Sequence, residues 1–526
     1  MVGIGTIGAD RLNESNNTPA KTKIKEDVAI GWTLMEINKT RDSAEVATTF
    51  LQTEIDLETK YWEDVVAVQQ AGWAVCKMPN ERHALGVRFG FSEAVPEFQR
   101  IGLAPLRRGD SGHANPALGT LAKTPKGLLV TYRTQHGSIG RCSLPAKTHA
   151  EAPLKERILE ARDTVFAREL WHELTRESRQ LHSYGVRLAD GKLTYQNDAG
   201  DTVELELVDL ESDAEMADPS VSANKTASTI AMTLKLLLSY AHRYNELMRI
   251  RPLPPHIPRS RGVQTYALLR PIIARMSFQR NIASCCSFIG NLTQALTKAG
   301  FPADFTLLTP ETSLTDPTAA QNPNQPSIAH TMIRNMVQVQ DFYFKLTLFP
   351  SVFITIRGRC YLFPVISTHI YVILPSDSPL QDICAPYKDG YPSVAALTEY
   401  LEDVTLRFLT NHFIAKLSAL TGQDNHEPSS GESHSVRWIQ SAKGTSILDY
   451  YKEDKEIQFS MDARTENNDE SNASGDDQTR PSLLLSTREE KGGKPVVKSW
   501  KWTRKGESEG HNMEDVIERF AKRFIS

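Results

Sequence analysis

Residues 46–68 read VATTFLQTEIDLETKYWEDVVAV and carry one continuous apolar stripe. Its members recur at intervals of three, four and seven residues: Val46, Phe50, Leu57, Tyr61, Val65 and Val68. This spacing is typical of one face of an α-helix, and the helical pattern extends from Gly31 to about Gln70. A helix of this kind must bury its stripe against another part of the chain or against a helix of another protein.

Two features favour a partner outside the chain. The stripe is long, and it lies outside any obvious domain, next to a polar leader over residues 1–28. Coiled-coil-like pairing with another chain is therefore expected. The six stripe residues are candidate partner-binding positions.

The remaining sequence predicts an α+β fold in which long N-terminal amphipathic helices, forming a coiled-coil-like bundle, precede a mixed α/β part with an antiparallel sheet. Its expected segments are a flexible leader 1–28, a helical partner-binding segment 29–80, a small β unit 81–150, a helix–hairpin–helix region 151–262, an α/β domain 263–425, and a partly disordered tail 426–526 that ends in a Trp-rich segment and a helix. The acidic stretch near residue 470 is expected to be disordered. Its role and the topology of the sheet stay open.

Composition excludes some classes of protein. The chain has 526 residues, 40% of them hydrophobic, and a formal net charge of −4. It therefore lacks the overall excess of positive charge that is typical of nucleic-acid-binding proteins. Six scattered cysteines without a CxxC pair predict neither a zinc site nor a disulfide scaffold. No signal peptide or membrane-spanning stretch is predicted.

Motifs for catalysis are missing as well. The sequence has no P-loop and no GxSxG elbow. His172-Glu173 begins like a zinc-protease motif, but Arg176 stands where the second histidine is required. We therefore predict no catalytic, metal-binding or cofactor-binding residue, and a protein that is not an enzyme.

A basic, aromatic cluster near the C-terminus has two interpretations. Trp500 and Trp502 alternate with Lys498, Lys501 and Arg504. Such a pattern can bind single-stranded nucleic acid, or it can form an edge strand or dock on a partner. Docking or folding is favoured, because the cluster is short and the preceding segment is acidic. Trp500 and Trp502 are thus candidate partner-binding residues, and a nucleic-acid-binding transcription factor is the alternative function.

Several strings resemble subunit 17 of the Mediator complex in its fungal form. They include Gly31-Trp32, the helix around Tyr61-Trp62, the stretch 85–94 (LGVRFGFSEA), the stretch 169–179 (ELWHELTRESR) and 268–272 (LLRPI). The resemblance implies a nuclear, non-enzymatic scaffold of the Mediator head module, a coactivator that links regulators to RNA polymerase II. It further implies helical bundling with head subunits 11 and 22 and packing near subunits 6 and 8, with no membrane contact, while direct nucleic-acid contact is not expected.

The resemblance also leaves questions open. Family members usually carry a longer region before Gly31-Trp32, so this chain is expected to be truncated or shorter than the family at its N-terminus. Any contacts of that region are open. Neither the surface that touches polymerase or activators nor regulation by modification follows from these strings.

Overall fold

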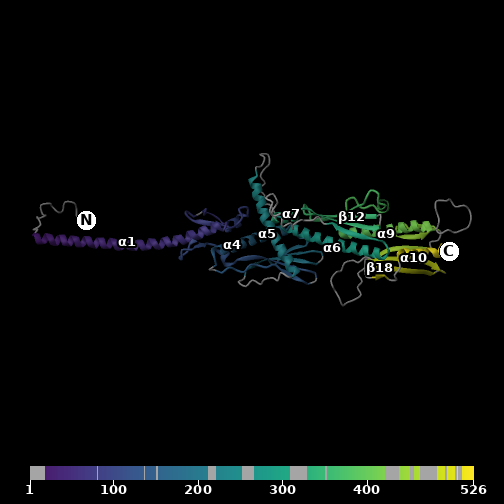
Figure 1. The fold of residues 1–526 in the computed structure, drawn as a ribbon, viewed down its shortest axis with the longest axis horizontal. Helices are drawn as coiled ribbons and strands as arrows, with labels where there is room; N and C mark the ends of the chain where they lie inside the picture. Colours follow the sequence, from purple (N-terminus) through teal and green to yellow (C-terminus); the bar gives the residue numbers. More distant parts are fainter. Residues whose placement is uncertain are drawn as a thin grey trace. The chain divides into compact units, whose positions relative to one another are not determined.

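The structure is a computed structural model. It describes residues 18–79, 81–135, 137–149, 152–198, 200–210, 221–251, 266–308, 328–349, 352–420, 437–450, 455–462, 482–491, 494–503, 506–507 and 512–525. The chain forms two compact units (Figure 1). Unit 1 comprises Met1–Gly127, Pro145–Ala167 and Asp209–Ala214, and unit 2 comprises Leu128–Leu144, Arg168–Val208 and Glu215–Ser526.

Unit 1 contains the long helix α1, Pro19–Gln70, and a four-stranded antiparallel sheet. A proline at the first position starts α1, where its missing N–H costs nothing. Gly72, with a φ of 88°, then turns the chain out of the helix into the sheet. The other elements are β1 Ala74–Lys77, β2 Leu85–Arg88, α2 Pro96–Ile101, β3 Leu103–Arg108, β4 Ala114–Pro116 and α3 Thr120–Lys123.

The core of unit 1 joins three elements. Val65 and Val68 of α1 pack with Val87 and Leu106 of the sheet and with Ile158 of α4 (Leu154–Ser178). Tyr61 packs against the edge of this core, and its hydroxyl donates a hydrogen bond to the carbonyl oxygen of Leu106 at 3.1 Å. Among the described residues of α1, only those near its C-terminal end therefore pack against the rest of unit 1.

Unit 2 begins with a five-stranded sheet in the order β6–β5–β9–β8–β7. Asp190 and Gly191, at φ values of 50° and 72°, make the two-residue turn of the β7–β8 hairpin, which lies within the helix–hairpin–helix region expected over residues 151–262. Gly140 of β6 lets α5 lie close, since a Cβ there would overlap the backbone of Ala223. The elements are β5 Lys126–Arg133, β6 Ile139–Arg141, η2 His182–Tyr184, β7 Val186–Ala189, β8 Lys192–Gln196, β9 Thr202–Asp209 and α5 Ser222–Ile250.

The larger part of unit 2 is built around α6, Leu269–Lys298. This helix contacts β10, β11, β12, β17, β18 and α9, so it packs against two antiparallel sheets. Figure 1 shows α6, α9 and the sheet containing β12 in this part of the fold. The elements are β10 Asp304–Leu308, α7 Ile328–Val337, β11 Gln340–Phe349, β12 Val352–Tyr361, β13 Ser367–Ile373, α8 Leu380–Ile383, α9 Val394–Leu420, β14 Trp438–Gln440, β15 Ser446–Asp449, β16 Lys455–Asp462, β17 Ser482–Lys491, β18 Lys494–Thr503, β19 Gly506–Glu507 and α10 Met513–Ile525.

The core of unit 2 follows from strand alternation. In β11, Phe342, Phe344 and Leu346 point inward and are fully buried, while Tyr343 and Lys345 between them stay at least partly exposed. The α+β fold class, with its long N-terminal helix and antiparallel sheet, is confirmed.

The expected segments differ from the structure in three places: the start of the first helix, the β unit 81–150 and the tail 426–526. Helix α1 begins at Pro19, inside the expected leader 1–28. The expected β unit 81–150 is divided, because β5 and β6 pair in the sheet of β7–β9 and not with β1–β4. The acidic stretch near residue 470 (residues 467–478), for which disorder is expected, lies outside the described residues.

The expected tail 426–526 differs most. Its described part forms the six-stranded sheet β14–β19 and α10, and both contribute to the core of unit 2. The reason is alternation: Phe459, Leu485 and Trp502 lie on the inward face of adjacent strands and are almost completely buried. The sequence between β16 and β17 has few apolar residues, so the alternation of the two strands is hard to recognise from the sequence.

We predict that Trp502→Ala lowers the free energy of unfolding of unit 2 by about 3–5 kcal/mol, because truncation of a buried Trp leaves a cavity. Val497→Ala on the same strand is the control. Val497 is 59% exposed, so its truncation should change the free energy by less than about 0.5 kcal/mol. Urea denaturation of the full chain measures both, and equal effects would show that β18 does not belong to the core.

Candidate interaction surface

Helix α1 exposes most of its length. It has 52 residues and is therefore about 78 Å long at 1.5 Å per residue. Every residue from 19 to 53 is exposed. Large apolar side chains are frequent on this solvent-facing helix: Ile24, Val28, Ile30, Trp32, Leu34, Met35, Ile37, Val46, Phe50, Leu51, Ile55, Trp62 and Val66. So much apolar surface on one helix is typical of an interaction site.

The stripe of residues 46–68 is divided by the structure. Val65 and Val68 are buried in the core of unit 1, and Leu57 and Tyr61 are half-buried at its edge. Val46 and Phe50 are 69% and 63% exposed. The stripe thus serves the chain's own core at one end and is free for a partner at the other.

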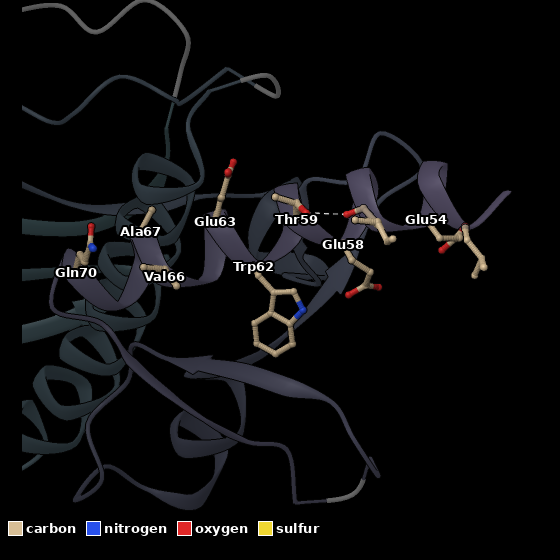
Figure 2. A pocket seen from close by; sticks show the side chains of 10 residues that line it. Glu54, Glu58, Thr59, Trp62, Glu63, Val66, Ala67 and Gln70 are labelled. Carbon is tan, nitrogen blue, oxygen red and sulfur yellow. Dashed lines mark hydrogen bonds between the residues drawn. The ribbon is translucent and has the colours of Figure 1, made fainter. Parts of the chain in front are cut away.

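A second apolar face of α1 was missed in the sequence. Leu51, Ile55, Trp62 and Val66 follow one another at spacings of four, seven and four, and they line a shallow groove (Figure 2). We call these four residues the α1 groove face. Its spacing is helical, but the neighbouring stripe has the same period, and periodicity alone cannot separate two apolar faces of one helix.

The groove face has an acidic rim. Glu54, Glu58 and Glu63 line the same groove. Arg108 lies 2.8 Å from Glu54 and 2.9 Å from Glu58, and these carboxylates raise the pKa of its guanidinium, chiefly through the hydrogen bond that the guanidinium donates to Glu54. A partner with basic residues beside its apolar anchors complements this rim.

The C-terminal tryptophans are placed inside unit 2. Trp502 is 2% exposed, and Trp500 is half-buried and packs against the same core. Arg504 and Lys505 lie outside the described residues. The two rings therefore stabilise the sheet β14–β19, which agrees with the folding interpretation of this cluster and leaves little of Trp502 for a partner.

A buried carboxylate cluster lies on α4 in unit 2. Glu169, Glu173 and Glu177 share one helical face and are each at most 2% exposed. His242 Nε2 of α5 lies 2.9 Å from Glu169, and Arg176 lies 3.2 Å from Glu173. Burial raises the pKa of Glu173. The sequence predicted neither the burial of these three carboxylates nor their partners.

Glu177 caps the start of α6. Its carboxylate accepts hydrogen bonds from the backbone N–H groups of Leu268, Leu269 and Arg270 at 2.8, 2.7 and 3.2 Å. Helix α6 has no side-chain cap of its own. These first N–H groups have no partner within the helix, so a distant glutamate satisfies them. Glu177 thus acts as a structural clamp between α4 and the start of α6.

Other chemistry finds no support in the part of the chain that the structure describes. No group of three or more His, Cys, Asp or Glu side chains there could hold a metal ion. His172 is exposed and lies 3.5 Å from Glu173. None of the described helices is both long and apolar enough to span a membrane.

Comparison with known proteins identifies the family. The sequence model for subunit 17 of the Mediator complex matches residues 1–296. The chain belongs to the Mediator subunit 17 family. The resemblance found in the sequence is thereby confirmed.

Several relatives carry the name Mediator of RNA polymerase II transcription subunit 17. That of Emericella nidulans is 36% identical over 304 residues, which cover 57% of this chain and 48% of the relative. That of Neosartorya fischeri is 29% identical over 441 residues, covering 83% of this chain and 67% of the relative. The matched part of this chain spans about half the length of the Emericella protein.

One solved structure is also similar. A chain of the Schizosaccharomyces pombe Mediator head module aligns with a TM-score of 0.49 and 13% identity, over 75% of this chain and 85% of that chain. Membership of the subunit 17 family rests on the sequence match.

We predict that Glu177→Ala lowers the free energy of unfolding by about 1–3 kcal/mol, because it leaves buried N–H groups at the start of α6 without an acceptor. Glu156→Ala is the control: Glu156 is exposed in the first turn of α4, the helix that carries Glu177, and its substitution should have little effect. Urea denaturation measures both changes. Equal free energies for the two variants would contradict the clamp.

The pH dependence of the clamp has a definite sign. Burial raises the pKa of Glu177 above its ordinary value of 4.5, although the three N–H donors and Arg270 oppose this rise. The unfolded chain therefore loses this proton first as the pH increases. The part of the stability that comes from this pKa shift is fully present below 4.5 and is lost as the pH rises through the raised pKa, whereas the hydrogen bonds to the N–H groups remain.

We therefore predict that the unfolding free energy of the wild type falls relative to that of Glu177→Gln as the pH is increased above about 4.5. Urea denaturation at a series of pH values gives this difference. A difference that stays flat or grows with pH would contradict the assignment.

Proposed function

We propose that this chain is a non-enzymatic scaffold subunit of the Mediator head module, acting in the nucleus between regulators and RNA polymerase II. The single observation that carries the proposal is the exposed apolar surface of α1. A helix of this length that buries only its last turns needs other chains to cover it. Family membership directs the choice of those chains.

The proposed partners of α1 are helices of head subunits 11 and 22. The expected mechanism is burial of apolar side chains, including Val46, Phe50 and the α1 groove face. Each large side chain that a partner covers contributes about 1.5–3 kcal/mol. The acidic rim selects partner helices that carry lysine or arginine beside their apolar residues.

Unit 2 is proposed to face head subunits 6 and 8. Its core is closed by its own sheets, so these contacts would involve surface side chains. Contacts with polymerase and with activators are proposed to occur within the assembled complex. The alternative function, nucleic-acid binding through Trp500 and Trp502, receives no support from rings that pack into the core of unit 2.

Co-expression with subunits 11 and 22, followed by size-exclusion chromatography, tests the proposal. We expect the wild-type chain to elute with both partners and to aggregate when it is produced alone. Leu51→Asp combined with Ile55→Asp should abolish co-elution, since two charges would be buried in the interface.

The matched control is Thr49→Asp combined with Gln52→Asp. Both residues are exposed on α1 outside the α1 groove face, and the change in charge is the same. Retained co-elution of this control is expected. A wild-type chain that elutes alone as a monomer without aggregating, and that co-elutes with neither partner, would refute the scaffold proposal for α1.

A further inference from the structure

The sheet β10–β13 has one buried face and one face that remains partly exposed. The buried face contributes Phe342, Phe344, Ile354 and Ile356 to the core of unit 2. On the opposite face, four aromatic rings keep contact with solvent: Tyr343, Phe353, Tyr361 and Tyr371. Aromatic side chains also stabilise strands, but this set places several flat apolar rings on one solvent-facing side of a sheet, where a ligand with flat apolar faces can stack.

Basic side chains alternate with these rings. The strand register places Tyr343, Arg357 and Tyr371 in one row across β11, β12 and β13. The Arg357 guanidinium lies 5.4 Å from the centre of the Tyr343 ring, and the Lys345 ammonium lies 5.4 Å from the Phe353 ring. Arg359 lies 5.9 Å from the Tyr361 ring. We call these seven residues the sheet platform.

The charge of the platform is positive although the chain as a whole is acidic. Asp341 is the carboxylate that faces the arginines, at 2.8 Å from Arg357 and 2.8 Å from Arg359. It holds both guanidinium groups against the sheet and neutralises one positive charge. The register also pairs Asp304 with the outward-facing Thr347, so Asp304 lies on the same face. Three cations against two carboxylates leave a local excess of one positive charge, while the chain carries a net charge of −4.

We propose that the sheet platform binds a single-stranded nucleic acid, a function beyond the scaffold role of α1. Bases would stack on the parts of the Tyr343, Phe353 and Tyr371 rings that Arg357, Lys345 and the backbone at Gly390 leave uncovered. The phosphates would lie on Lys345 and the arginines. Tyr343 and Tyr371 are two strands apart, roughly 10 Å at the usual strand spacing, which leaves room for one base on each ring. The platform is separate from the segment around Trp500.

Fluorescence anisotropy with the full chain, fused to a solubility partner, tests the proposal. The probes are a labelled 12-nucleotide oligo(U), an abasic oligonucleotide of the same length, a duplex of the same length and a polyglutamate peptide. We expect oligo(U) to bind most tightly. Three phosphate contacts predict a slope of about −2 for log affinity against log salt concentration.

Tyr343→Leu combined with Tyr371→Leu should weaken oligo(U) binding at least about tenfold, since each lost stacking partner weakens binding several-fold or more. Leucine keeps an apolar side chain at both positions, and circular dichroism verifies the fold. Asp341→Asn should strengthen binding, because it removes the charge that opposes the phosphates. A purely structural role of the platform would not produce opposite changes.

The matched control is Arg437→Ala combined with Tyr450→Ala, which removes an exposed cation–π pair of 5.5 Å from a different part of unit 2. This control should bind like the wild type. Equal affinity for the oligo(U) and abasic probes would overturn base stacking, and tighter binding of polyglutamate would point to an acidic polypeptide instead. Absence of oligo(U) binding at low salt, or unchanged binding by the tyrosine variants, would also overturn the proposal.

Discussion

The three hydrogen bonds from the start of α6 to Glu177 are the constraint on which unit 2 depends. Helix α6 carries the residues against which both neighbouring sheets pack, and its own sequence offers no cap for its first turn. A carboxylate more than ninety residues earlier supplies the missing acceptor. One buried glutamate thereby fixes α4 to the helix that organises the larger core, and the geometry of each depends on the other.

The same contact explains two of the strings that resemble the family. The stretch 169–179 supplies the buried carboxylates, and the stretch 268–272 supplies the N–H groups that Glu177 receives. Both strings are visible in the sequence, but nothing in the sequence indicates that they touch, because their spacing has no period. The strings that resemble the family thus include parts of this internal contact as well as part of α1, the proposed partner surface.

Local patterns predicted local structure well. The period of α1 and the Asp190-Gly191 turn are both present, because each depends on neighbouring residues alone. The pairing of β5 with β9 and the burial of Trp502 depend on residues far apart in the chain, so no pattern around them reveals these contacts. The stripe of residues 46–68 lies between these cases: its helix was predictable, but which of its apolar residues enter the core was not.

The position of α10 has a consequence for synthesis of the protein. Met513 and Ala521 are fully buried in a core that also contains residues of α6, and the Met513 N–H donates to the carbonyl oxygen of Ala299. At the usual translation rate, the 214 residues between the end of α6 at Lys298 and the start of α10 at Met513 take on the order of 10–40 s to emerge from the ribosome. During that time the aromatic side chains of β11 and β12 belong to a core that is incomplete until α10 has been made, and such exposed apolar surface favours aggregation.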